Sequence, residues 1–138
     1  MKYQFVIFAL VFFFLSHAQT VATDKEKKET AEKKPTPKKP KIIYGVASYY
    51  AEKFNGRQTA NGEIYDGKKL TAACNQLPLG TWIRVTNLNN NRSVIVKTND
   101  RLHIRMKRVV DLSRAAAEKL GYISRGLTKV RVEVLEKK

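Results

Sequence analysis

Short stretches of alternating apolar and polar residues dominate the second half of the chain. Residues 82–87 and 93–98 alternate in this way, and the asparagines between them tolerate a positive φ, so the two stretches predict a β-hairpin. Residues 42–50 are rich in β-branched and aromatic side chains and predict a strand with a bend or bulge at Gly45. Three further short strands are predicted at 70–74, 109–112 and 127–135.

One short helix and one long loop complete this pattern. Ser113 is a suitable N-cap for the helix-forming residues that follow, and Gly121 is a suitable stop, which together predict a helix of about two turns. Residues 53–69 contain three Asn-Gly or Asp-Gly pairs and predict a long irregular loop of the kind that often carries function. Six strands and one helix predict an all-β fold with a small α component, either a barrel or a sandwich.

The first part of the chain predicts export rather than folding. Residues 1–18 combine a basic start, an apolar run and a small-residue cleavage site, which is the pattern of a secretory signal peptide. We expect export to the periplasm, the cell envelope or the medium, without stable membrane insertion after cleavage, because the apolar run is too short to cross a bilayer. Residues 19–41 are rich in Lys, Glu and Pro and predict a disordered linker. The predicted domain is 42–138.

The strongly basic composition narrows the choice of partners. The chain carries 27 Lys and Arg against 12 Asp and Glu, a formal net charge of +15. Such a surface suits a polyanion, and export favours a cell-wall polymer over nucleic acid. The single cysteine excludes an intrachain disulfide. The chain has no glycine motif for dinucleotides or phosphates, and one cysteine with one domain histidine does not form the usual zinc site, so we expect no cofactor.

Carboxylates near turns are the candidates for chemistry. Asp100 follows a predicted strand, which would hold it at the mouth of a cleft, and the alternative is a surface ion pair with a nearby arginine. Glu63 and Asp66 lie in the long loop, where Asp66 could instead make an Asx-turn before Gly67. Asp111 precedes the predicted helix and is expected to hydrogen-bond to the backbone.

Aromatic and sulfur-bearing side chains have alternative roles. Cys74 follows two alanines and fits a small buried position. Trp82 lies on an alternating strand and is expected in the core, with a sugar-stacking surface as the alternative. The same two roles are open for the tyrosines Tyr49, Tyr50 and Tyr65.

A series of motifs resembles the RlpA-like (rare lipoprotein A) domain: ASYY, TANGE, LTAA, LPLGT, VTN, NDR and VDLS, in this order. The match runs from about Gly45 to Leu135. The resemblance implies a six-stranded double-psi β-barrel related in shape to expansins. It also implies a lytic transglycosylase that cuts peptidoglycan glycan strands, preferably strands without stem peptides, and leaves 1,6-anhydro ends.

The resemblance also implies roles for particular residues. Asp100 matches the position of the general acid and base. Glu63 and Asp66 match positions in the same groove, where they would orient sugar hydroxyls or support Asp100. Substrate contacts are expected along this groove from Tyr49, Tyr50, Thr59, Asn61, Cys74, Asn99, Arg101 and His103. The domain is expected to act as a monomer on peptidoglycan glycan strands.

Two positions depart from the family pattern. Cys74 occupies the place of a common histidine, and Leu102-His103 replaces a common Gly-Pro. We therefore predict that His103 reaches back toward Asp100 and supplies the missing imidazole. A thiol is not a cationic hydrogen-bond partner, so a non-catalytic, expansin-like glycan-binding module stays the alternative to an enzyme.

Overall fold

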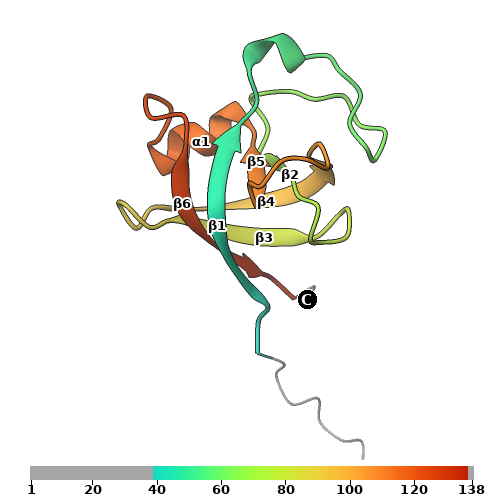
Figure 1. Ribbon diagram of the computed structural model, residues 1–138. Helices are drawn as coiled ribbons and strands as arrows, with labels where there is room; N and C mark the ends of the chain where they lie inside the picture. Colours follow the sequence, from blue (N-terminus) through green and yellow to red (C-terminus); the bar gives the residue numbers. More distant parts are fainter. Residues whose placement is uncertain (1–38, 137–138) are drawn as a thin grey trace, which may run out of the picture. The chain divides into compact units, whose positions relative to one another are not determined.

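Residues 39–136 are the part of the chain that the computed structural model describes. The predicted signal peptide at 1–18 and most of the predicted linker at 19–41 lie outside the described residues. Within residues 39–136, no helix is both long and apolar enough to span a membrane. The described residues form a small β-barrel with one helix (Figure 1).

Six strands close the barrel in the order β1-β5-β2-β4-β3-β6. β1 pairs with β5 and β2 pairs with β4 in parallel, whereas the other pairs are antiparallel. This mixed six-stranded barrel with one short helix confirms the predicted fold class. In chain order the elements are β1 Ile42–Tyr49, the 3-10 helix η1 Glu52–Phe54, β2 Thr71–Ala73, β3 Trp82–Asn87, β4 Ser93–Asp100, β5 Val110–Leu112, α1 Arg114–Leu120 and β6 Thr128–Val134.

The predicted hairpin is confirmed by the antiparallel pairing of β3 with β4. Asn91, in the turn, takes a positive φ of 59°. The buried side chain of Asn87 donates to the carbonyl oxygen of Leu120 at 2.9 Å and accepts from the hydroxyl of Thr128 at 2.7 Å. These bonds tie the hairpin to the end of α1 and to the start of β6.

The predicted helix α1 is also confirmed at both ends. The side chain of Ser113 accepts a hydrogen bond from the amide of Ala116, and Gly121 ends the helix with a φ of 74°. Ala116, Ala117 and Leu120 are buried and belong to the barrel core. A helix of this length has one apolar face, which is the face that α1 buries.

Inward-facing aliphatic side chains fill the barrel. Val85 on β3, Val96 on β4 and Val132 on β6 have no exposed surface, and burying each contributes about 1.5–3 kcal/mol. Cys74 belongs to the same cluster and is fully buried. The role of a small buried hydrophobic side chain is therefore confirmed for Cys74.

The core position predicted for Trp82 is wrong. Trp82 lies on the outside of β3 and is 44% exposed. The next residue, Ile83, is fully buried, and successive side chains of a strand point to opposite faces. The strand can bury either Trp82 or Ile83, and it buries the smaller side chain.

The bend or bulge predicted at Gly45 is wrong as well. β1 continues through Gly45, which pairs with Val130 on β6. A Cβ atom at this position would lie 2.9 Å from the Cβ of Val109. Val109 comes this close because its amide donates to the carbonyl oxygen of Val46 at 2.9 Å. Glycine is therefore needed here for close packing between β1 and the segment before β5.

We expect Gly45→Ala to destabilise the barrel by about 1–3 kcal/mol, because an added methyl group in a packed contact forces its neighbours to shift. Urea unfolding followed by tryptophan fluorescence measures this change. The control is Val109→Gly, which removes the atoms that the new methyl group would meet. Gly45→Ala should cost less in that background, and an equal cost in both backgrounds would show that the contact is not the cause.

Candidate active site

Asp100 is the last residue of β4, and a β-bulge sets the direction of its side chain. Ala72 on β2 pairs with Thr98, but the next residue, Ala73, pairs with Asp100. Asn99 is therefore an extra residue on β4, and the alternation of the strand shifts by one position. Thr98 and Asn99 are both buried, whereas Asp100 is partly exposed. The bulge turns the carboxylate of Asp100 out of the core.

Asp100 lines a cavity of about 710 Å³. The walls of the cavity come from the loop that follows β1 and from the segment between β4 and β5. This volume lies within the range of about 300–1,000 Å³ that is usual for ligand pockets. Five of the predicted substrate-contacting residues line the same cavity, namely Tyr49, Tyr50, Thr59, Arg101 and His103.

Three hydrogen-bond donors hold the carboxylate of Asp100. Its Oδ2 accepts from the hydroxyl of Tyr50 at 2.6 Å. Its Oδ1 accepts from the backbone N–H of Ala60 at 2.9 Å and from that of Arg101 at 2.8 Å. Hydrogen bonds to a charged group are each worth roughly 1.5–3 kcal/mol. The carboxylate is thus fixed in one orientation, which is what proton transfer to a bound ligand requires.

No salt bridge in the described residues involves Asp100. The guanidinium of Arg101 donates instead to the backbone carbonyl oxygen of Cys74. Arg108 binds both carboxylate oxygens of Asp111, at 2.8 and 3.0 Å. The surface ion pair considered for Asp100 is therefore not formed. The backbone role predicted for Asp111 is wrong, because its carboxylate is held by an arginine.

The rings of Tyr50 and Tyr65 pack at a tilt of 37°, with centroids 4.5 Å apart, and Tyr50 contacts Asp100. Burial, together with the hydrogen bond to Asp100, raises the pKa of Tyr50 far above its ordinary value. The Tyr50 hydroxyl therefore stays neutral and remains a donor. The hydroxyl of Tyr65 accepts from the backbone N–H of Arg114 at 3.3 Å. Tyr65 is buried, whereas Tyr50 is partly exposed toward the cavity.

Glu63 lies next to the bulge and does not line the Asp100 cavity. Its carboxylate accepts from the side-chain amide of Asn99 at 3.1 Å. Hydrogen bonds from Asn99 and Asn61 lower the pKa of Glu63, so this group is ionised at neutral pH. The hydroxyl of Thr59 donates to the side-chain oxygen of Asn61 at 2.7 Å and closes the turn that carries Glu63.

Asp66 lines a second cavity, of about 620 Å³. Tyr50 and Tyr65 line both cavities, whereas Asp100 lines only the first and Asp66 only the second. The Oδ1 of Asp66 accepts from the backbone N–H of Lys68 at 2.9 Å, which confirms the Asx-turn. The structure therefore does not bring Asp66 into the cavity of Asp100.

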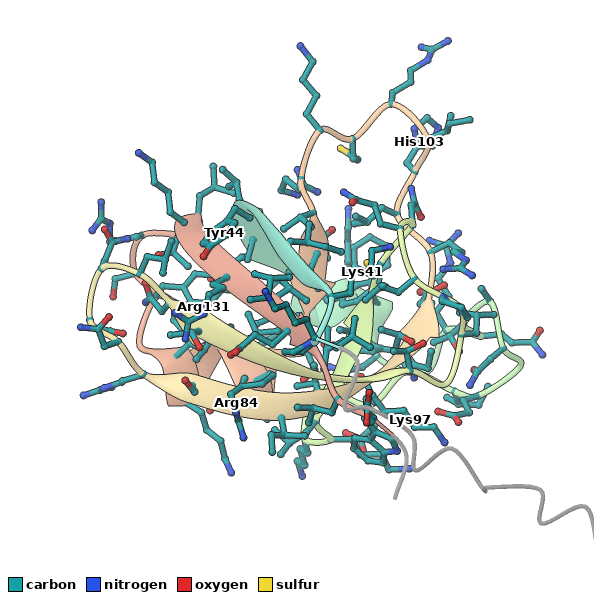
Figure 2. All side chains as sticks on the ribbon, turned by 90° about the horizontal axis from the view of Figure 1, so that it is seen from below. Lys41, Tyr44, Arg84, Lys97, His103 and Arg131 are labelled. Carbon is teal, nitrogen blue, oxygen red and sulfur yellow. The ribbon has the colours of Figure 1, made fainter. Side chains whose placement is uncertain are left out.

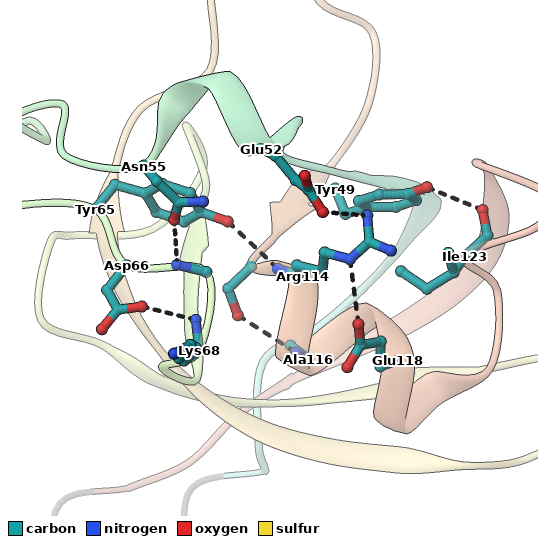
Figure 3. A network of polar contacts seen from close by, with 12 residues as sticks. Tyr49, Glu52, Asn55, Tyr65, Asp66, Lys68, Arg114, Ala116, Glu118 and Ile123 are labelled. Atoms are coloured by element: carbon teal, nitrogen blue, oxygen red, sulfur yellow. Dashed lines mark hydrogen bonds and ion pairs between the residues drawn. The ribbon is translucent and has the colours of Figure 1, made fainter.

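An arginine held by two acids forms part of the second cavity. Arg114 lies 3.4 Å from the carboxylate of Glu52 and 3.2 Å from that of Glu118 (Figure 3). Both carboxylates are mostly exposed, so each pair contributes at most about 1 kcal/mol. Their effect is to orient Arg114 along the cavity wall.

Three predicted substrate contacts, Asn61, Cys74 and Asn99, do not line the cavity. Cys74 is fully buried and does not reach the cavity surface, because it occupies a core position after β2. His103 lines the cavity, but its Nδ1 accepts from the backbone N–H of Arg105 at 3.3 Å. Among the described residues it makes no hydrogen bond to Asp100. His103 lies on a loop that projects away from the strands (Figure 2), and its imidazole makes no direct contact of the predicted kind with the carboxylate.

Sequence reasoning missed two features of this site. One is the backbone N–H of Ala60, which has no side-chain signal of its own. The other is the bulge at Asn99, which depends on pairing with a distant strand. A partial signal for the first was the turn sequence TANGE, because its Asn-Gly pair predicts a tight turn that exposes backbone N–H groups.

The polar groups around Asp100 suit a hydrogen-bonding ligand. Within residues 39–136, no three His, Cys, Asp or Glu side chains are grouped so that they could hold a metal ion. The first cavity instead combines aromatic rings with a carboxylate and basic side chains. Aromatic side chains with a few placed polar groups are the usual lining of a ligand-binding pocket.

The chain is similar to known proteins over nearly the whole barrel. A family profile described as "Lytic transglycolase" matches residues 42–132. The endolytic peptidoglycan transglycosylase RlpA of Haemophilus influenzae is 53% identical over 94 residues, which are 68% of this chain and 33% of that protein. The protein of the same name from Pseudomonas aeruginosa is also 53% identical over 94 residues, 68% of this chain and 28% of that protein.

This chain therefore belongs to the RlpA-like family of double-psi β-barrel lytic transglycosylases. It spans about a third of the length of the relatives it matches. Family membership thus rests on the barrel itself, which is the part that the chain and its relatives share.

Solved structures share this barrel at low sequence identity. An apo expansin from Clavibacter michiganensis is 17% identical with a TM-score of 0.58, over 71% of this chain and 52% of that chain. A Streptomyces papain inhibitor is 24% identical with a TM-score of 0.57, over 70% of this chain and 96% of that chain. These likenesses concern the fold alone, and the expansin confirms the double-psi barrel that the motifs implied.

We expect Asn99→Ala to raise the pKa of Glu63, because it removes the hydrogen-bond donor that does most to stabilise the ionised carboxylate. Lys97→Ala should raise it less, because the lysine charge is a smaller cause of the shift. Carboxyl carbon NMR across an acid titration measures both changes, with thermal unfolding as the check on folding. A larger effect from Lys97→Ala would contradict the hydrogen-bonded arrangement beside the bulge.

Proposed function

We propose that this chain is an exported lytic transglycosylase that cleaves the β-1,4 bond between MurNAc and GlcNAc in peptidoglycan glycan strands. The observation that supports this most is the Asp100 carboxylate, held by three donors at the wall of a cavity of about 710 Å³. The name of the relatives, endolytic peptidoglycan transglycosylase, favours the same reaction and cleavage within the strand. Strands without stem peptides are the preferred substrate in this proposal.

The proposed reaction needs one group that gives a proton and then takes one. Asp100 donates a proton to O4 of the leaving sugar as the bond between C1 and O4 breaks. It then takes the proton from the C6 hydroxyl of MurNAc as O6 bonds to C1 and closes the 1,6-anhydro ring. Atoms and protons balance without water. A second carboxylate, which a glycoside hydrolase uses as base or nucleophile, is therefore not required.

Tyr50 and Glu63 act as positioning residues in this proposal. Tyr50 holds one lone pair of the Asp100 Oδ2 and leaves the other for the substrate. Glu63 is kept ionised and is poorly suited to donate a proton. Its role is to hold Asn99 at the bulge and to accept hydrogen bonds from the hydroxyl groups of a sugar. Asp66, in the second cavity, would accept hydrogen bonds from the hydroxyl groups of the adjacent sugar unit.

Export and the basic composition fit the proposed substrate. The predicted signal peptide would place the chain in the periplasm, the cell envelope or the medium, where peptidoglycan lies. A net charge of +15 attracts glycan that carries lactyl carboxylates. The reaction as written uses only Asp100 and the substrate, so a monomer without a cofactor suffices.

A non-catalytic, expansin-like glycan-binding module is the second candidate function. The observation that favours it is Cys74, which stands where the family commonly has histidine and is fully buried. His103 lines the same cavity but makes no direct hydrogen bond to Asp100. Both candidates use the same cavity to bind glycan, so the formation of product separates them.

We expect Asp100→Asn to remove the 1,6-anhydro product, because loss of a general acid typically costs about 10²–10⁴-fold in rate. The full chain is incubated with peptide-free glycan strands, and the released fragments are identified by mass spectrometry. Asp66→Asn is the comparison variant: it removes a carboxylate with a proposed binding role from the neighbouring cavity and should slow product formation far less than Asp100→Asn. Thermal unfolding shows whether each variant is folded.

Two outcomes would oppose this proposal. Product formed by Asp100→Asn at the wild-type rate would exclude Asp100 as the acid and base. Binding of glycan by the wild-type chain without any product would support the second candidate function instead.

A further inference from the structure

The barrel carries a set of outward side chains that the proposed reaction does not use. They lie on the neighbouring strands β1, β6, β3 and β4, and none of them lines either cavity. We call this surface the outer face and define it by Tyr44, Trp82, Arg84, Ile95, Lys97 and Arg131. Figure 2 shows four of these residues, Tyr44, Arg84, Lys97 and Arg131, along the strands.

Large apolar side chains are exposed on the outer face. Tyr44 is 66% exposed, and Trp82 and Ile95 are each 44% exposed. The strands cannot turn these side chains inward, because a shift by one residue would expose the buried core set instead. Grouped exposed apolar side chains with a polar surround mark an interaction site more often than isolated ones do.

Cationic side chains lie among these apolar ones. Tyr44 pairs across strands with Arg131, and Trp82 pairs with Lys97. The Nζ of Lys97 lies 5.9 Å from the Trp82 ring centroid. Arg84 makes no salt bridge within the described residues. Glu133 lies beside Arg131 at 3.5 Å and offsets one of these charges, so the outer face is positive.

We propose that the outer face is a second, non-catalytic binding site for carboxylate-bearing glycan. This inference rests on the proposed function, because the polymer is the proposed substrate. The aromatic rings offer flat apolar surfaces on which sugar rings can lie. The arginine and lysine side chains attract the lactyl carboxylates. Two attachment points keep the chain on the polymer between cleavage events, since the second contact becomes intramolecular.

Charge favours this occupant over a second copy of the chain. In a symmetric dimer the same patch of both subunits would meet. Two cationic faces would then oppose each other, which costs free energy. A polyanion has the opposite sign and gains from every cation on the face.

Binding of the full chain to peptide-free glycan strands that are immobilised on beads tests the proposal. The Asp100→Asn background prevents cleavage and makes the assay independent of catalysis. In this background Arg84→Glu should bind about fivefold to tenfold more weakly at low salt, and the difference should shrink at high salt. Trp82→Ala should bind more weakly at both salt concentrations, because the lost contact is apolar.

Lys119→Glu is the matched control, since it reverses the charge of an exposed residue on α1, which carries none of the outer-face residues. It should bind like the parent. Tyr44→Ala is a second apolar variant, in case Trp82→Ala alters thermal unfolding. Parent-like binding by both Arg84→Glu and Tyr44→Ala would overturn the proposal.

Two further results distinguish the proposed glycan site from self-association and from failure of the proposed function. A dimer that forms in analytical ultracentrifugation and dissociates in Arg84→Glu would assign the outer face to self-association and would overturn the glycan site. If the proposed function is wrong, the wild-type chain forms no 1,6-anhydro product, which is a separate measurement. The binding difference between Arg84→Glu and Lys119→Glu does not depend on that product.

Discussion

The three hydrogen bonds to Asp100 depend on how the barrel closes. Parallel pairing of β2 with β4 creates the bulge at Asn99 that turns the carboxylate outward. Parallel pairing of β1 with β5 sets the position of Tyr50, whose amide donates to the carbonyl oxygen of Leu112 at 3.0 Å. The loop after β1 then returns to place the N–H of Ala60 against the same group. The position and orientation of the Asp100 carboxylate therefore depend on the register of the strands and not on one loop alone.

The three candidate carboxylates and the cations of the outer face lie on different parts of this basic molecule. Asp100, Glu63 and Asp66 lie at or beside the cavities, where hydroxyl, amide and backbone N–H groups hold them. The outer face collects exposed aromatic rings and cations on the strands themselves. A chain of high net charge can therefore keep its candidate catalytic carboxylate free of ion pairs while it presents a basic surface elsewhere.

Local patterns predicted the elements well and the site less well. Alternation located the hairpin strands, and Ser113 and Gly121 located α1, because these signals act within a few residues. The Asx-turn of Asp66 was predictable for the same reason. The bulge at Asn99, the outward direction of Trp82 and the approach of Val109 to Gly45 depend on pairing between distant segments. The role of Asp100 came from family resemblance, since its residue chemistry alone left an ion pair open.

Cleavage of peptide-free glycan in water enriched in heavy oxygen tests most directly whether one carboxylate moves a proton between two substrate oxygens without water. A single acid–base Asp100 predicts fragments that end in 1,6-anhydro rings and carry no heavy oxygen from the solvent. Mass spectrometry of the fragments distinguishes this from hydrolysis. Fragments with reducing ends labelled by the solvent would contradict the proposed reaction, because a water molecule would then have been the nucleophile.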